Sequence, residues 1–119
     1  MSVGTIVSQR DIVLIPFPFS DLPQNKKRPA IIISCDNYNR NNVDVICCAI
    51  TSNLKDYRQS VEIGYNDFES GHLDYASLIK PAKVFSLQQN RIIKKLARLN
   101  VRKSKEVINR LSETIKINE

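Results

Sequence analysis

The chain has 119 residues, about the size of one domain, and we expect a single domain over residues 1–119. Its 42% hydrophobic and 25% charged residues are typical of a soluble globular protein, and no apolar run reaches the about 18 residues that a membrane-spanning helix needs. The N-terminal residues lack the basic and apolar regions of a secretory signal, which indicates a cytoplasmic protein. The net charge of +6 indicates an anionic partner, either nucleic acid or an acidic protein.

The first predicted strand is DIVLIPFPFSD, residues 11–21. Its apolar run and the alternation of Phe17 and Phe19 are typical of a strand, whereas Pro16 and Pro18 have no backbone N–H to donate. A strand with two such gaps cannot pair fully on both sides. We therefore expect it at an edge of the sheet, or bending away at its end.

Two more strands follow, RPAIIIS (28–34) and VDVICCAIT (43–51), joined by a polar segment, DNYNRNN (36–42), that predicts a turn. Short polar connectors between consecutive strands favour an antiparallel meander. In that arrangement the end of the later strand lies beside the start of the earlier one. Arg28 and Thr51 are therefore predicted neighbours, although 23 positions separate them.

The second half of the chain predicts a short strand at SVEIGY (60–65), a loop at NDFESGHLDY (66–75) and a longer strand at SLIKPAKVFSL (77–87). Pro81 lies inside the longer strand and indicates a bulge or a break. From Gln89 the pattern predicts a helix or turn, and then a last short strand near residues 95–100.

The chain closes on a predicted amphipathic helix. Ser104 is a good N-cap, and apolar residues recur at helical spacing through residues 105–117. The region just before and into this helix is strongly basic, because residues 75–105 contain nine Lys or Arg and no Asp or Glu. The whole pattern predicts a mostly β (α+β) fold, a small antiparallel barrel with a C-terminal helix.

The cysteines and the histidine give little sign of chemistry. Cys35, Cys47 and Cys48 are odd in number and lack C-x-x-C spacing, so we interpret them as small core hydrophobes. His72 lies in a turn-like context and is a weak catalytic candidate. Common nucleotide-binding and hydrolase motifs are absent, and three glycines are too few for a phosphate cradle. We predict neither a metal nor another cofactor.

The basic run before the second strand has two readings: a solubilising surface loop, or an anion site. Arg28 precedes Pro29, which confines Arg28 to extended geometry and fixes where its side chain leaves the strand. Its planar guanidinium matches phosphate oxygens and stays charged. Thr51 and Ser52 add hydroxyls where the third strand ends. Together they predict a metal-free site for a phosphodiester.

The runs RDIVLIPFPFSDLPQNKKRPAIIIS (10–34) and CCAITSN (47–53) resemble the MazF/PemK family of toxin endoribonucleases, and the similarity extends over nearly the whole chain. The resemblance implies an SH3-like barrel of the CcdB/PemK type that acts as a homodimer, with the third strand and the terminal helix contributing to the contact. It also implies metal-independent cleavage of single-stranded RNA (mRNA) at short sequences, and silencing by a cognate antitoxin that occupies the RNA groove.

By the same resemblance, Arg28 and Thr51 are the catalytic residues. The ribose 2′-hydroxyl would attack the adjacent phosphate and leave a 2′,3′-cyclic phosphate, with Arg28 stabilising the phosphorane and Thr51 orienting the phosphate. Some side chains near these two are expected to bind or shape the path of the RNA. They are Phe17, Ser20, Asp21, Lys26, Lys27, Ser52 and Lys80.

The sequence differs from the family pattern at several positions. Relatives usually have Gly before the first-strand aspartate, where Arg10 precedes Asp11 here, and some have an aspartate where Ala82 stands. No general base can be named. Two other functions stay open: a nucleic-acid-binding module without catalysis, and a gyrase poison of the CcdB type. The paired Arg28 and Thr51 favour the ribonuclease.

Overall fold

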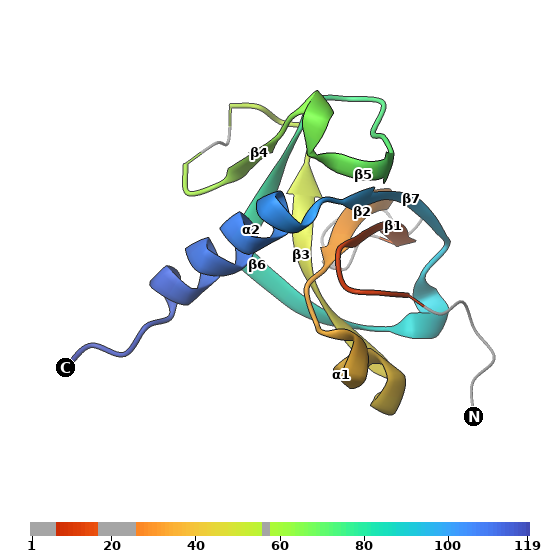
Figure 1. Cartoon of the computed structure of the whole chain (residues 1–119). Coiled ribbons are helices and arrows are strands. Elements are labelled where there is room, and N and C mark those ends of the chain that lie inside the picture. Colours follow the sequence, from red (N-terminus) through yellow and green to blue (C-terminus); the bar gives the residue numbers. More distant parts are fainter. Residues whose placement is uncertain (1–6, 17–25, 56–57) are drawn as a thin grey trace.

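The computed structural model describes residues 7–16, 26–55 and 58–119, which form one strongly curled antiparallel sheet and a long C-terminal helix (Figure 1). The strands are β1 (Asp11–Pro16), β2 (Lys27–Ile32), β3 (Asp44–Thr51), β4 (Val61–Ile63), β5 (Phe68–Gly71), β6 (Ser77–Gln88) and β7 (Lys94–Leu99). The helices are α1 (Asp36–Asn41) and α2 (Val101–Thr114), with short 3-10 turns η1 (Tyr65–Asp67) and η2 (Gln89–Arg91).

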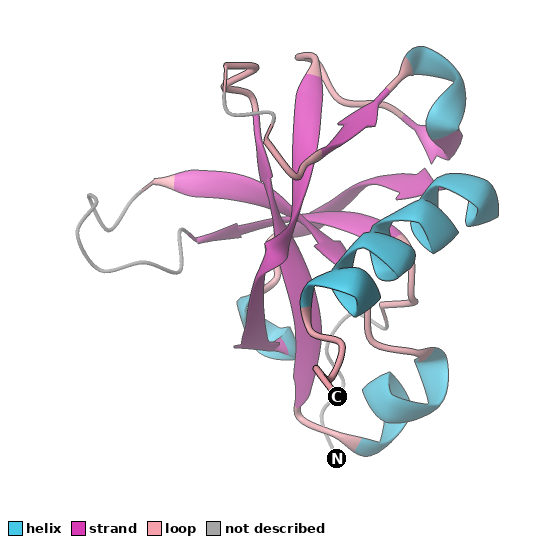
Figure 2. Ribbon diagram, turned by 90° about the vertical axis from the view of Figure 1, so that its left-hand side faces the viewer, coloured by secondary structure: helices cyan, strands magenta, loops and turns pink. Residues whose placement is uncertain are grey.

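The seven strands follow the order β4-β6-β3-β2-β1-β7-β5, so that β4 and β5 form the edges of an open half-barrel (Figures 1 and 2). The predicted mostly β fold with a C-terminal helix is confirmed, as is the antiparallel meander of the first three strands. No described helix is long and apolar enough to cross a membrane.

Of the two alternatives expected for the first strand, the edge position is wrong, because β1 pairs with β2 on one side and with β7 on the other. The other alternative, that the strand bends away at its end, falls on residues after Pro16 that lie outside the described residues. Pro16 is the last residue of β1, so the missing donor falls where the ladder ends. Pro18, the second expected break, lies outside the described residues. Because Pro16 lies at the end of β1, its missing N–H does not prevent the strand from pairing on both sides.

Two segments predicted as irregular carry structure. The Asn-rich turn is the helix α1, with Asp36 in its first turn and Arg40 in its last, as the helix dipole favours. The loop at 66–75 contains most of η1 and the whole of β5, a four-residue edge strand that pairs with β7. Gly71 ends β5 with φ +69°, and a Cβ there would stand 2.6 Å from the Leu96 carbonyl oxygen, so this edge requires a glycine.

The terminal helix begins earlier than the sequence predicted. Its N-cap is Asn100, whose side-chain oxygen accepts the Lys103 N–H at 2.8 Å. Ser104, the expected cap, lies in the first turn and donates its hydroxyl back to the Asn100 carbonyl at 2.8 Å. Asn and Ser have similar N-cap preferences, so only the path of β7 into the helix decides between them.

We expect Asn100→Ala to lower the free energy of unfolding by about 1 to 2 kcal/mol, because the first turn of α2 loses its capping acceptor. Ser104→Ala is the matched control. It removes a hydroxyl that only back-bonds within the helix, so the expected change is below about 0.5 kcal/mol. Urea unfolding followed by circular dichroism measures both. Equal effects of the two substitutions would contradict Asn100 as the cap.

The two faces of the sheet carry separate hydrophobic clusters. Alternate residues of β2 divide between them: Ile31 belongs to the cluster beneath α2, together with Val107, and Ala30 and Ile32 belong to the other. All four of these side chains are fully buried. This alternation determines which face each site residue occupies.

Candidate functional site

The start of β2 and the end of β3 lie side by side. The two strands are antiparallel, with Ala30 opposite Ala49 and Ile31 opposite Cys48. The same register continued by two residues brings Arg28 opposite Thr51, across the about 4.8 Å that separates neighbouring strands. On its other side, Arg28 lies across from Ile15 of β1.

Arg28, Thr51 and Lys80 share one face of the sheet. Residues two apart on a strand point to the same side of the sheet. Arg28 therefore lies on the same face as Ala30, and Thr51 on the same face as Ala49. Lys80 of β6 lies directly opposite Ala49 and therefore shares that side. All three site side chains are half-buried. The fold brings together two cations and a hydroxyl from three strands.

The Thr51 hydroxyl is fixed by a local turn. Its Oγ1 accepts the backbone N–H of Asn53 at 3.1 Å, which uses the oxygen as acceptor and leaves the hydroxyl hydrogen for donation. Ser52, the next residue, is exposed just beyond the strand. A threonine held in this way can donate to an anionic oxygen placed over the end of β3.

The other predicted RNA-binding residues divide by their position in the chain. Lys26 and Lys27 are exposed, and Lys27 opens β2 opposite Pro16. Phe17, Ser20 and Asp21 lie outside the described residues, and their expected roles stay predictions.

The sequence named no general base, and the strand pairing names one nearby carboxylate, Glu62. It lies on β4 opposite Leu78, and Leu78 lies opposite Thr51 on the other side. Two strand spacings put the backbone of Glu62 about 10 Å from that of Thr51. No sequence pattern could identify Glu62 as a neighbour of the site, because its position there depends on the register between β4 and β6.

The cysteines separate into two environments. Cys47 and Cys48 are buried, as expected of core residues, and burial raises the pKa of each thiol to about 12, with the neighbouring Cys48 adding to the shift at Cys47. Cys35 is exposed just before α1, so its expected place in the core is wrong. It lies after the end of β2, where the chain has left the sheet.

Under native conditions at pH 8, we expect a thiol reagent to modify Cys35 rapidly and the two buried cysteines slowly, since burial blocks access and keeps them protonated. Titration with a chromogenic disulfide should give one fast equivalent in the folded protein and three in denaturant. The variant Cys35→Ser should lose the fast equivalent. A fast equivalent that persists in this variant would contradict the assignment.

His72 is exposed, with its Nε2 3.3 Å from Asp74, and stays a surface residue in a turn, as expected. Over residues 7–16, 26–55 and 58–119, no three His, Cys, Asp or Glu side chains gather in a group that could hold a metal ion. Metal independence stays a prediction.

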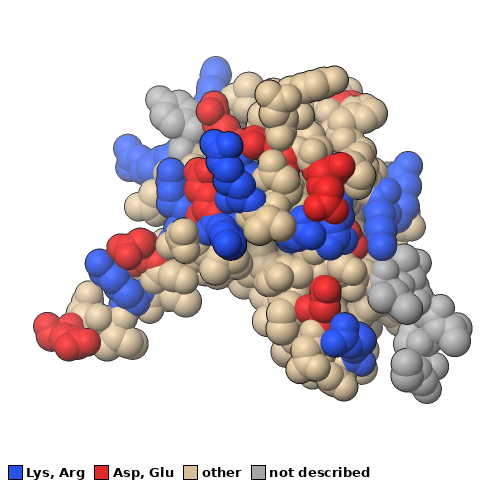
Figure 3. Space-filling view, in the orientation of Figure 1, with Lys and Arg blue, Asp and Glu red and all other residues tan. Residues whose placement is uncertain are grey.

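The basic second half of the chain is partly neutralised by carboxylates from elsewhere. Asp11 is buried at the start of β1, and its two oxygens lie 3.3 Å from Lys95 and 3.1 Å from Arg98 of β7. Arg98 also pairs with Glu69 at 3.0 Å, and Lys103 with Asp67. Red and blue side chains are accordingly interspersed over the face seen in Figure 3. The basic residues of this region are contiguous in the sequence, but in the folded protein carboxylates lie among them.

The backbone of Arg10 has φ 81°, in the left-handed region that favours glycine. Its guanidinium donates to the Leu99 carbonyl at 2.9 Å and to Glu69 at 3.0 Å. The hydrogen bond from Arg10, helped by the charges of Arg10 and Arg98, outweighs slight desolvation and holds the pKa of Glu69 below its usual value. These contacts offset the backbone strain.

A hollow of about 310 Å³ lies between α2 and the C-terminal end of β2. Ile31, Ile33, Val101 and Ile108 supply much of its apolar lining, and Lys105 lies at its side. None of the predicted site residues lines it. Arg28 lies at the opposite end of β2, so this hollow and the Arg28 site are separate surfaces.

Comparison with family models gives one match, to the model described as PemK-like, MazF-like toxin of type II toxin-antitoxin system, over residues 8–115. The comparison with curated protein sequences finds no match.

Solved structures show the same fold at low identity. A MazE–MazF crystal structure from Deinococcus radiodurans is 21% identical, with a TM-score of 0.74, and 96% of this chain and 99% of that chain are covered. An endoribonuclease from Mycobacterial species is 14% identical, with 99% of both chains covered and a TM-score of 0.74. Another, in complex with its cognate antitoxin, is 12% identical, with 96% and 97% covered and a TM-score of 0.73.

Proposed function

Because the chain belongs to the family of PemK-like and MazF-like toxins of type II toxin–antitoxin systems, we propose that it is a toxin that cleaves single-stranded RNA. The observation that carries this proposal is the shared position of Arg28 and Thr51 at the ends of two paired strands. Arginine supplies a planar cationic fork and threonine a hydroxyl donor, and a phosphodiester accepts from both. A gyrase poison would have no need of this pair.

In the proposed reaction the ribose 2′-hydroxyl oxygen attacks the adjacent phosphorus while the bond to the 5′-oxygen of the next nucleotide breaks. The products are a 2′,3′-cyclic phosphate and a 5′-hydroxyl. The 2′ proton passes to a solvent water, and the departing 5′-oxygen takes one proton from solvent, so that protons balance. Arg28 stabilises the charge that develops on the phosphorane, and Thr51 orients a nonbridging oxygen. The nucleophile belongs to the substrate, so the reaction requires no metal-bound water.

The test is incubation of the purified protein with a mixed-sequence single-stranded RNA in excess EDTA. We expect cleavage at a short preferred sequence, with 2′,3′-cyclic phosphate ends identified by mass spectrometry. A second RNA with 2′-O-methyl riboses should stay intact, because it has no nucleophile. Binding of RNA without cleavage, with or without added Mg²⁺ or Mn²⁺, would overturn the proposal in favour of a binding module.

We also propose that the chain acts in the cytoplasm as a homodimer that a cognate antitoxin silences. The endoribonuclease and MazE–MazF complexes of similar fold support the antitoxin partner. The first turn of α2 supports a role for the terminal helix in dimerisation, since Val101 is 49% exposed and lines the hollow beside β2.

We expect Val101→Asp to convert the dimer into a monomer, because a carboxylate would be buried without a partner in an apolar contact. Aspartate in the first turn favours the helix dipole, so the helix itself should persist. Light scattering after size exclusion measures the mass. Ser112→Asp, on an exposed position of the same helix, is the control and should stay dimeric. A wild type that is monomeric at micromolar concentration would contradict the dimer.

A further inference from the structure

The strand β6 contains an unusually large bulge beside the Arg28–Thr51 site. Cys48 of β3 lies opposite Val84, and the next residue, Ala49, lies opposite Lys80. One step along β3 therefore corresponds to four steps along β6, which leaves Pro81, Ala82 and Lys83 as extra residues. An ordinary bulge inserts one residue, and bulges often lie next to active sites, where they redirect a side chain.

Only one end of the bulge is held in the protein. Pro81 is fully buried, and its carbonyl accepts a hydrogen bond from the Cys48 thiol at 3.6 Å. Ala82 and Lys83 are exposed. Ion pairs among the described residues involve other cations, so Lys83 has no described carboxylate partner. The bulge presents an ammonium group to solvent from an anchored backbone.

The bulge starts at Pro81, directly after Lys80. The strand register places Lys80 close to the Arg28–Thr51 site. Lys80 lies opposite Ala49, and Ala49 is two residues from Thr51 on the same strand. On the far side of Ala49 is Ala30, two residues from Arg28. Two strand spacings make about 10 Å between the lines of β2 and β6. A single strand of RNA whose scissile phosphate lies over Arg28 and Thr51, and which continues across β3, reaches the bulge.

We infer that the bulge is a phosphate-binding extension of the site, in which Lys83, three residues after Lys80, holds a backbone phosphate next to the scissile one. This inference rests on the proposed ribonuclease function. An ammonium on a flexible stem is a point charge without the directional fork of arginine. It contacts phosphate without reading a base, so Lys83 adds affinity in a sequence-independent way and takes no part in the bond changes.

The test is the salt dependence of binding to a mixed-sequence 2′-O-methyl RNA, which cannot be cleaved. Each neutralised phosphate of a single strand contributes about 0.7 to the slope of log K against log salt. We expect Lys83→Met to lower the magnitude of the slope by about 0.7. If Lys83→Met and the wild type bind equally at about 1 M salt, this change in slope makes the variant bind RNA about eightfold more weakly than the wild type at about 50 mM. Lys83→Arg should restore the wild-type slope.

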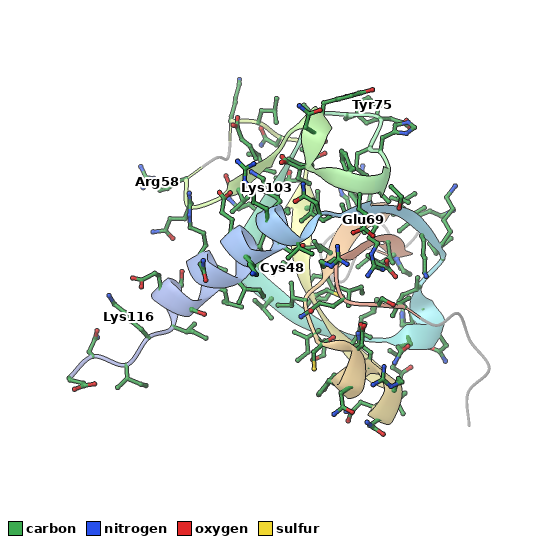
Figure 4. All side chains as sticks on the ribbon, viewed as in Figure 1. Cys48, Arg58, Glu69, Tyr75, Lys103 and Lys116 are labelled. Atoms are coloured by element: carbon green, nitrogen blue, oxygen red, sulfur yellow. The ribbon has the colours of Figure 1, made fainter. Side chains whose placement is uncertain are left out.

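The matched control is Lys116→Met, which removes the same charge from the chain beyond α2 (Figure 4). It should keep the wild-type slope. If Lys83→Met also keeps the wild-type slope while the wild-type protein binds and cleaves RNA, the bulge has no phosphate contact and this inference alone fails. If Lys116→Met lowers the slope as much as Lys83→Met, the effect is one of net charge, and the inference again fails. A wild type that neither binds nor cleaves RNA removes the proposed function together with the inference.

Discussion

Arg28→Ala should reduce kcat/KM for RNA cleavage by about 10²- to 10³-fold, or about 3 to 4 kcal/mol of transition-state stabilisation. The physical reason is that the phosphorane carries more negative charge than the starting diester, so a fixed cation stabilises the transition state more than the substrate. The measurement is a single-turnover assay with an RNA that contains the preferred sequence. Binding of the uncleavable 2′-O-methyl RNA should weaken far less than cleavage.

Arg28→Lys and Lys26→Ala separate geometry from charge. Lysine keeps the positive charge and loses the planar fork, so most of the rate should be lost in Arg28→Lys. Lys26 is exposed before β2 begins, and its removal should mainly raise KM. The circular dichroism spectrum and melting temperature of each variant check the fold. A rate in Arg28→Ala within about threefold of wild type, with RNA bound normally, would exclude Arg28 from the chemistry.

Asp11→Ala should lower the free energy of unfolding by about 2 to 3 kcal/mol. The buried carboxylate accepts the Ser8 N–H at 2.8 Å and meets Lys95 and Arg98, so it ties the start of β1 to β7. Hydrogen bonds to charged groups contribute about 1.5 to 3 kcal/mol. The loss stays below the about 3 to 5 kcal/mol of a fully buried pair, because the partly exposed side chains of Lys95 and Arg98 regain water.

Glu113→Gln is the control for this prediction. Glu113 pairs with Lys116 at 3.2 Å, but both side chains are mostly exposed, and such pairs contribute about 0 to 1 kcal/mol. Chemical unfolding of the two variants in parallel, in low and in high salt, gives the comparison. An Asp11→Ala variant as stable as Glu113→Gln would mean that the cluster at β1 and β7 adds nothing to stability.

Most strands could be predicted because their apolar runs are long or alternate regularly. The segments at 28–34, 43–51 and 77–87 match β2, β3 and β6 to within two residues at each end, and the break expected at Pro81 is a bulge. The short elements of polar composition were not predicted. The helix α1 and the edge strand β5 carry few apolar residues, so no hydrophobic period marks them, and packing and pairing with the rest of the sheet hold them.

The sequence by itself determined the family and the antiparallel meander, because both depend on local patterns of residues. Only the tertiary structure decided that β1 lies inside the sheet, that Asn100 rather than Ser104 caps α2, and that Lys83 lies on a bulge beside the site. Each of these depends on which strand lies next to which, and in what register. Strand neighbours come from parts of the chain far apart in sequence, so no local window contains that information.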